Sequence, residues 1–140
     1  MEDMVKMELK RILIQENSGQ QFIFLQECDG PRSFPIVIGT AEAFAIDRRL
    51  KGIQSPRPLT HDLIYNVMHG LDGHLEKIII SDLREIMVND HPEYTYFAML
   101  IVRRGDELIE IDSRPSDAIA LGVAQNTPIY VAQHVLDSAG

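Results

Sequence analysis

Two short segments of the sequence join an arginine and a proline to a hydroxyl residue, an aspartate and an apolar stretch. They span residues 57–64 and residues 114–120. Proline sets the backbone of a first helical turn, and a hydroxyl or carboxylate oxygen can accept hydrogen bonds from the free N–H groups there. The arginine would then lie at a helix start, which is an arrangement that can bind an anion. The plainer interpretation is a capping device in which each arginine pairs with the aspartate of its own segment.

Hydrolysis of a phosphodiester bond is a reaction that these residue types could perform. It needs an activated water molecule, cations that balance the charge on phosphorus, and stabilisation of the leaving oxygen. Carboxylates can hold Mg²⁺ or Mn²⁺, arginines can contact phosphate through two nitrogens, and a histidine can act as acid or base. The candidate catalytic residues are Asp112, Asp117 and His61, the candidate substrate-binding residues are Arg57, Arg114 and Ser116, and the candidate metal ligands are Asp112 and Asp117.

Hydrophobic periodicity predicts the elements that position these residues. In the first half, two strands flank a turn at residues 17–19, a third strand ends at Gly39, and Gly52 ends a first helix that Thr40 would cap. A connector with two prolines then leads into an amphipathic helix. The predicted ranges are strands over residues 5–14, 21–25 and 34–38, and helices over residues 40–51 and 60–71.

The second half is predicted to contribute further strands, one apolar helix and a final short helix. The predicted ranges are strands over residues 75–83, 94–102, 108–111 and 129–131, a loop over 89–92, an apolar helix over 116–124 and one or two helical turns over 133–139. Helices and strands alternate too little for a doubly wound parallel sheet. The predicted fold class is therefore α+β, with a mostly antiparallel, mixed sheet, helices on one side of it, and a single compact domain over residues 1–140.

The composition predicts a cytoplasmic protein with little general affinity for polyanions. The formal net charge is −8 and the pI is about 5.0, so any contact with nucleic acid must be local. Cys28 is the only cysteine, which excludes an intrachain disulfide and a cysteine-based zinc site. The acidic start lacks the basic and apolar runs of a signal peptide, and no uncharged run reaches membrane-spanning length, so no membrane contact is expected.

Four blocks of sequence, in a fixed order, carry a resemblance to a known family. They are residues 35–39 with Glu42 and Ala43, residues 57–63, residues 111–121 and residues 128–131. Together they resemble the bifunctional nuclease domain family over about residues 5–139, and the block over 112–121 is the most specific. The resemblance implies a small α+β domain that forms homo-oligomers, with the DNase and RNase activity attributed to plant members, and hence DNA or RNA as substrate.

Two other interpretations of the same blocks stay open. In one, the chain is a non-enzymatic, oligomeric binding or scaffold domain whose arginines bind a small anion or a carboxylate of a partner protein. In the other, the blocks only specify the fold and a subunit interface, because a serine or aspartate at a helix start is most often a cap. Location discriminates between them. Arg57, Arg114, Asp112 and Asp117 around one open cleft favour chemistry, and burial in mutual ion pairs favours architecture.

Overall fold

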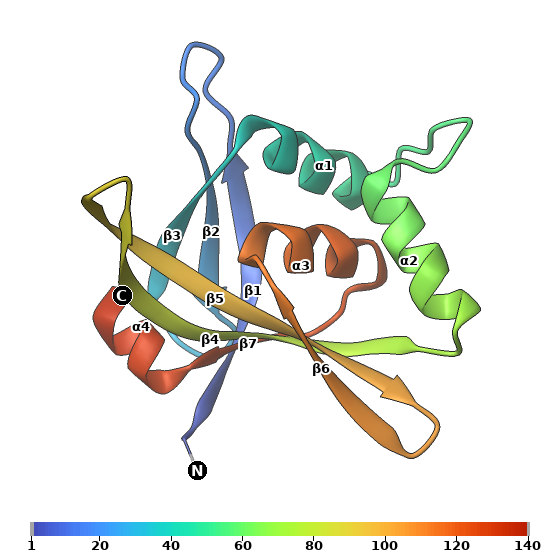
Figure 1. Ribbon diagram of the computed structural model, residues 1–140. Coiled ribbons are helices and arrows are strands. Elements are labelled where there is room, and N and C mark those ends of the chain that lie inside the picture. The colour runs from blue at the N-terminus through green and yellow to red at the C-terminus, as the bar shows by residue number, and fades with distance from the viewer. Residues whose placement is uncertain (1, 140) are drawn as a thin grey trace.

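The computed structural model describes residues 2–139, and within this range the chain forms one curved sheet with helices packed on it (Figure 1). The elements are β1 (Met4–Leu13), β2 (Gln21–Glu27), β3 (Ser33–Ile38), α1 (Thr40–Leu50), α2 (Thr60–Gly70), β4 (His74–Val88), β5 (His91–Arg104), β6 (Glu107–Ser113), α3 (Pro115–Gly122), a 3₁₀ turn (Val123–Gln125), β7 (Ile129–Ala132) and α4 (Gln133–Ala139). This order confirms the predicted α+β class.

The sheet has seven strands in the order β3-β2-β1-β7-β4-β5-β6 within the described residues. Every neighbouring pair is antiparallel except β4 with β7, which is parallel. The last strand in the chain, β7, therefore lies in the centre of the sheet. It joins the three N-terminal strands to the β4–β5–β6 meander. The predicted mostly antiparallel, mixed sheet is confirmed.

Alternation along the strands explains which face of the sheet carries the core. In β2, Ile23 and Leu25 are buried, while Phe22 and Phe24, which alternate with them, are half-buried on the other face. The sheet also curls. Its curl brings Phe34 of β3 onto Tyr96 of β5, with ring centroids 5.8 Å apart, although these strands are far apart in the sheet order. The curl forms a concave side in which the helices can bury their apolar faces.

The helix α3 lies in the middle of this concave side (Figure 1). Seven of its eight residues are buried, and Asp117 is the exception. It contacts α1, α2, β4 and β5, and its close approach to β4 relies on Gly122, where an added Cβ would lie 2.6 Å from Ile78 Cδ1. The core therefore determines which side chain of α3 reaches solvent.

The helix α4 lies apart from α1, α2 and α3 and packs on β4 and β7 (Figure 1). Its Val135 and Leu136 are fully buried, so the short C-terminal helix closes another part of the same core. The predicted position of the helix in the chain is confirmed.

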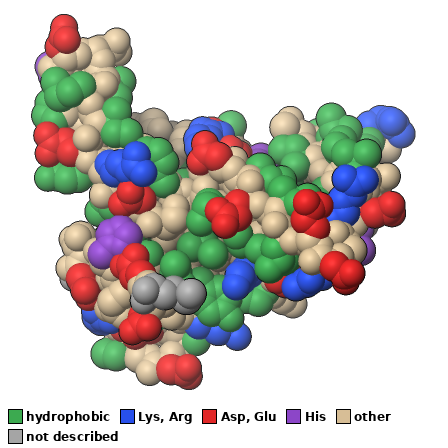
Figure 2. All heavy atoms as spheres, turned by 60° about the horizontal axis from the view of Figure 1, so that its bottom comes forward, with side chains coloured by type: hydrophobic (Ala, Val, Ile, Leu, Met, Phe, Trp, Pro, Cys, Tyr) green, Lys and Arg blue, Asp and Glu red, His purple; other side chains and the backbone are tan. Residues whose placement is uncertain are grey.

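The strands β4 and β5 are longer than predicted, and the loop expected over residues 89–92 is shorter, because only Asn89 and Asp90 lie between the strands. Both strands continue to a two-residue turn at Asn89 and Asp90, which have φ of 50° and 65°. Such left-handed pairs close tight hairpins, and asparagine and aspartate tolerate them. The hairpin tip projects from the body as an arm, which is the protrusion at the upper left of Figure 2.

Candidate functional site

Four charged or polar side chains meet at the start of α3. Arg114 Nε lies 2.9 Å from Asp117 Oδ2 and its Nη2 lies 3.2 Å from Asp117 Oδ1, while Arg114 Nη1 donates to Glu42 Oε1 at 3.1 Å. His61 Nε2 lies 2.9 Å from Asp117 Oδ1. We call Arg114, Asp117, His61 and Glu42 the Asp117 cluster.

Three helix starts converge on the Asp117 cluster. Glu42, His61 and Asp117 lie in the first turns of α1, α2 and α3 respectively, and Arg114 is the residue just before α3. Helix N-termini carry a partial positive charge that stabilises negatively charged groups nearby. The carboxylates of Glu42 and Asp117 therefore both lie beside a helix N-terminus and the guanidinium of Arg114.

The electrostatics of Asp117 follow from two opposing effects. Burial acts to raise the pKa of Asp117, but hydrogen bonds from Arg114 and His61 and their charges outweigh it, so the pKa lies below its usual value. The hydrogen bond to Asp117 in turn raises the pKa of Arg114 above its ordinary value. At neutral pH the pair is therefore an ionised carboxylate and a guanidinium.

The Asp117 cluster is open to solvent between two depressions of about 630 Å³ and 710 Å³. Both are lined by Thr60, His61, Arg114 and Asp117, so these residues form the ridge that separates them. The Arg114 side chain is 63% exposed, whereas that of His61 is 12% exposed. A ligand could reach the guanidinium directly and the histidine only from within a depression.

Of the predicted site residues, the structure brings together Arg114, Asp117 and His61. Arg57 lies elsewhere on the surface and makes no hydrogen bond or ion pair with any residue in the described part of the chain. Ser116 is 5% exposed and borders a different depression, beside Gly39. The first and second arginine–proline segments are therefore not equivalent in space.

The helix caps explain why the two segments differ. Pro115 is the first residue of α3, as predicted, but Pro58 precedes the N-cap residue Leu59 of α2, so it lies outside the helix. The predicted pairing of arginine with its own aspartate is confirmed for Arg114. In the first segment it is wrong, because Asp62 accepts a hydrogen bond from the Leu59 N–H and pairs with arginines of α1.

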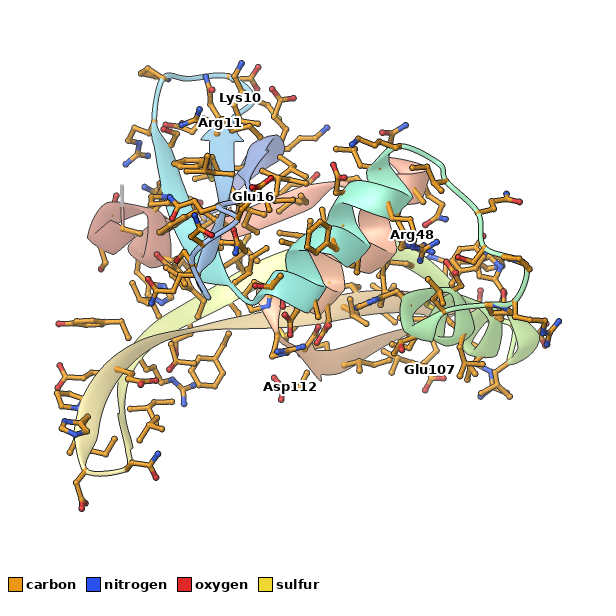
Figure 3. The ribbon with its side chains drawn as sticks, turned by 90° about the horizontal axis from the view of Figure 1, so that it is seen from above. Lys10, Arg11, Glu16, Arg48, Glu107 and Asp112 are labelled. Carbon is orange, nitrogen blue, oxygen red and sulfur yellow. The ribbon has the colours of Figure 1, made fainter. Side chains whose placement is uncertain are left out.

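Asp112 borders the depression on the β6 side but does not join the Asp117 cluster. Side chains alternate along a strand, so Asp112 shares a face of β6 with Glu110, while Ile111 and Ser113 share the other. Figure 3 shows Asp112 at the end of β6, directed away from α1. Its carboxylate makes no ion pair or hydrogen bond with another described residue.

Asp112 and Asp117, the predicted metal ligands, differ in how their carboxylates are engaged. Both oxygens of Asp117 already accept hydrogen bonds, from Arg114 and His61, and Asp112 lies on the face of β6 that carries Glu110. Among residues 2–139, no three histidine, cysteine, aspartate or glutamate side chains are grouped to hold a metal ion. Both aspartates line the depression on the β6 side, but a Mg²⁺ or Mn²⁺ ion held between them would compete with the hydrogen bonds that Asp117 accepts.

Glu42 is the member of the Asp117 cluster that the candidate set did not contain. It belongs to the first of the four blocks that carry the family resemblance, and a first helical turn is a common position for a carboxylate. Nothing in the local sequence links it to Arg114, because 72 residues separate them. Only the packing of α1 on α3 brings the two together.

A second cluster, beside the first, is architectural. Arg49 is 8% exposed and donates from Nε to the carbonyl of Ala120 at 2.5 Å and from Nη2 to that of Leu121 at 3.3 Å, at the end of α3. Its Nη1 lies 2.5 Å from Asp62 Oδ1. Arg48, which lies between α1 and α2 in Figure 3, also binds Asp62. This cluster ties α1, α2 and α3 into one unit and holds the three helix starts in place.

The sequence comparisons agree with the class of protein that this fold and site indicate, a single α+β domain with an arginine–aspartate–histidine site at a helix start. The sequence model of the family described as "Bifunctional nuclease domain" matches residues 23–140. The chain belongs to the bifunctional nuclease domain family. It is also 39% identical over 129 residues to two proteins from Mycobacterium tuberculosis, uncharacterized protein MT1877 of strain CDC 1551 / Oshkosh and uncharacterized protein Rv1829 of strain H37Rv. The match covers 92% of this chain and 72% of each relative.

Across residues 2–139, none of the helices combines the length and apolar character needed to cross a bilayer.

Proposed function

We propose that the protein is a nuclease that hydrolyses phosphodiester bonds of DNA or RNA at the Asp117 cluster. The observation that carries the proposal is the position of the Asp117 carboxylate between the exposed guanidinium of Arg114 and the imidazole of His61. Family membership supports a role related to nucleic acid. The acidic charge of −8 and the mixture of acidic and basic side chains on the face in Figure 2 favour a local contact rather than an extended basic groove.

Arg114 is suited to hold a phosphate without leaving its partners. A guanidinium has five N–H donors, and Arg114 uses one each on Nε, Nη1 and Nη2 for Asp117 and Glu42. One donor on Nη1 and one on Nη2 therefore stay free, and two adjacent donors match two oxygens of a phosphate. The charge that develops on phosphorus during attack would be stabilised by this contact.

His61 is suited to move the proton. Its Nε2 is bound to Asp117, which fixes the ring orientation and leaves Nδ1 to exchange a proton with water or with the leaving oxygen. A carboxylate that orients an imidazole also stabilises the imidazolium that forms when the ring accepts a proton. In this proposal Asp117 orients both the acid–base group and the phosphate-binding group.

Dependence on Mg²⁺ or Mn²⁺ stays a prediction from the sequence, with Asp112 and Asp117 as its predicted ligands. The roles proposed for Arg114, His61 and Asp117 require no metal.

The experiment is a digestion of single-stranded DNA, duplex DNA and RNA by the purified protein, with and without Mg²⁺ or Mn²⁺, beside Arg114→Ala. The matched control is Arg32→Ala, because Arg32 also bridges two carboxylates, Glu27 and Asp137, away from the cluster. Cleavage that Arg114→Ala loses and Arg32→Ala keeps is the expected result. Cleavage that is absent in the wild type, or equal in both variants, contradicts the proposal.

The second candidate is a non-enzymatic domain that binds a small anion or a partner's carboxylate at the same place. The convergence of three helix starts on Arg114 favours it, because helix N-termini attract anions. Calorimetric titration with inorganic phosphate distinguishes the two candidates. Phosphate binding that depends on Arg114 but not on Arg32, in a protein without nuclease activity, would select this candidate over the first.

A further inference from the structure

The strand β5 has a free backbone edge over residues 91–97. The neighbouring strand β6 pairs only with residues 98–104 of β5, and it ends at Ser113 because Pro115 begins α3. Over residues 91–97, β5 pairs with β4 alone among the described strands, and this two-stranded part includes the arm. A ribbon of two strands is marginally stable in water and gains from a third strand. The edge that β6 leaves free is therefore a place where another strand can add.

The backbone groups of Tyr94 and Tyr96 point toward this free edge. Phe97 directs its carbonyl toward β4, where it accepts a hydrogen bond from the Ser81 hydroxyl at 3.3 Å. Successive residues of a strand direct their N–H and C=O groups to opposite edges. Tyr96 and Tyr94 therefore direct theirs away from β4, on the side that β6 occupies further along β5. Both residues offer a donor and an acceptor to an added strand.

A depression of about 590 Å³ lies along this edge. Residues 94–96 of β5 form one wall of it and residues 35–38 of β3 form the other. The strand β3 is the last strand of the sheet and pairs only with β2, so its outer edge is also open. Figure 1 shows β3 and the arm on the same side of the molecule. We call this depression the β3–β5 groove, and an extended segment within it would lie between two free strand edges.

The walls of the β3–β5 groove offer apolar contacts to the side chains of such a segment. Tyr94 is 75% exposed and Val37 is 53% exposed, and they line the groove from opposite walls. Pro35 of β3 has no N–H, which is tolerated in an edge strand. The hydrogen bonds to an added strand would therefore come mainly from β5, while β3 contributes apolar surface.

Arg114 supplies a positive charge at one end of the groove. It is the only charged residue among the described residues that line the groove, and its two free Nη donors match the two oxygens of a carboxylate. Because β6 runs antiparallel to β5 and ends at Ser113, Arg114 lies at the Phe97 end of the free edge. A segment that runs parallel to β5 would end there, so Arg114 is placed to bind its C-terminal carboxylate.

We infer that the β3–β5 groove binds the C-terminal segment of a partner protein as an added strand, parallel to β5, with its terminal carboxylate on Arg114. Strand addition and the capture of a terminal carboxylate are both recurring modes of peptide recognition. A nucleic acid has no row of N–H and C=O groups to pair with β5. It also carries a charge at every nucleotide, which one arginine on a chain of net charge −8 does not balance. The inference rests on the anion-binding role of Arg114 in the proposed function, but it does not require cleavage.

Peptides with free C-termini are the probe for the test. An array of hexapeptides of randomised sequence is screened with the purified protein, because about six residues at roughly 3.3 Å each span the free edge. The strongest binders are then made with a carboxyl or an amide end and titrated by fluorescence polarisation. The amide form, and the variant Arg114→Ala with the carboxyl form, are each expected to bind at least about 10-fold more weakly, since a charge-assisted hydrogen bond is lost. The control Arg32→Ala is expected to bind like the wild type.

The backbone pairing is tested by a second pair of variants. Tyr94→Pro removes the N–H that points into the groove and keeps the ladder to β4, whereas Tyr94→Thr removes the ring and keeps the N–H. Tyr94→Pro is expected to bind the peptide roughly 5–10-fold more weakly than Tyr94→Thr. In the wild type, added peptide is expected to slow amide hydrogen exchange at Tyr94 and Tyr96. Exchange at Thr95 and Phe97, whose N–H groups point toward β4, should stay unchanged.

Several outcomes would overturn the inference. They are an array without any binder, equal binding of the carboxyl and amide forms, and protection of Tyr94 and Tyr96 in the protein alone, which would show that another copy of the chain occupies the edge. Binding of single-stranded oligothymidine that Tyr94→Thr weakens, without peptide binding, would assign the groove to nucleic acid instead. Cleavage of nucleic acid without peptide binding would overturn this inference and leave the proposed nuclease, whereas peptide binding without cleavage would do the reverse.

Discussion

His61 Nε2 lies 2.9 Å from Asp117 Oδ1, and 56 residues separate the two side chains in the sequence. The contact joins the first turn of α2 to the first turn of α3, beside the ion pair of Asp117 with Arg114. Both α1 and α2 are held on α3 by the buried Arg49 and its bonds to Asp62 and to the α3 carbonyls. The geometry of the candidate site therefore rests on an architectural cluster that takes no part in its chemistry.

Asp117→Asn is expected to abolish cleavage while the thermal midpoint stays nearly unchanged. An amide cannot stabilise a protonated His61, so a loss of at least about 100-fold in rate is expected. The free energy of unfolding should fall by no more than about 1 kcal/mol, because the ion pair is partly exposed. The matched control is Asp137→Asn, at the ion pair with Arg32. A collapse of the thermal midpoint in Asp117→Asn alone would assign Asp117 a structural role instead.

Arg49→Met is expected to destabilise the fold by about 3–5 kcal/mol, the usual cost of removing one partner of a buried ion pair. The variant leaves the carbonyls of Ala120 and Leu121 without their donor. Arg48→Met is the control, because Arg48 binds the same Asp62 from a more exposed position and should cost about 1 kcal/mol. Urea unfolding measures both. Equal losses in the two variants would contradict the central role of Arg49.

Gly122→Ala is expected to destabilise the protein by about 1–3 kcal/mol through overpacking. The new methyl group would lie 2.6 Å from Ile78 Cδ1 and 3.1 Å from Thr127 Cβ. Ile78→Val removes Cδ1, so the double variant should be more stable than the sum of the two single effects predicts. The coupling is measured by a double-mutant cycle in urea. Strict additivity would show that α3 does not rest on β4 at this point.

The contacts of His134 with Glu2 and Asp82, which we call the His134 clasp, predict a dependence of stability on pH. His134 of α4 lies between Glu2, at 2.5 Å, and Asp82 of β4, at 3.1 Å. Hydrogen bonds to Asp82 and Glu2 raise the pKa of His134 above its usual 6.5. Its contribution is therefore full below pH 6.5 and is lost as pH rises through the raised value.

Asp82 limits the same clasp on the acidic side. A hydrogen bond from Arg84, and then one from His134, lowers the pKa of Asp82 to about 2. Its contribution is present above its ordinary value of 3.8 and is lost as pH falls through about 2. His134→Gln should remove the decline of the thermal midpoint as pH rises above 6.5, because the raised pKa of His134 is the source of that decline, whereas His91→Gln on the arm should leave the curve unchanged. A decline above pH 6.5 that persists in His134→Gln would exclude the clasp as its source.

The amino-acid sequence predicted the parts of this protein that depend on local pattern. Strand alternation and helical spacing predicted the order of elements and the α+β class, and the Arg114–Asp117 pair follows from their spacing at a helix start. The amphipathic pattern of α2 was also visible. The helical spacing of apolar residues predicts that a helix has an apolar face, but it does not indicate what covers that face. The exposure of Leu63 and Val67 could therefore not be predicted.

Tertiary packing decided the composition of the site. Alternation placed Asp112 opposite Ile111, but which face of β6 points toward the helices depends on how the sheet curls. Asp62 pairs with α1 rather than with Arg57, and Glu42 reaches Arg114 across 72 residues, because the buried α3 fixes how α1 and α2 lie on it. Interactions between residues far apart in the chain depend on the relative orientation of whole elements, which local propensity and spacing do not contain.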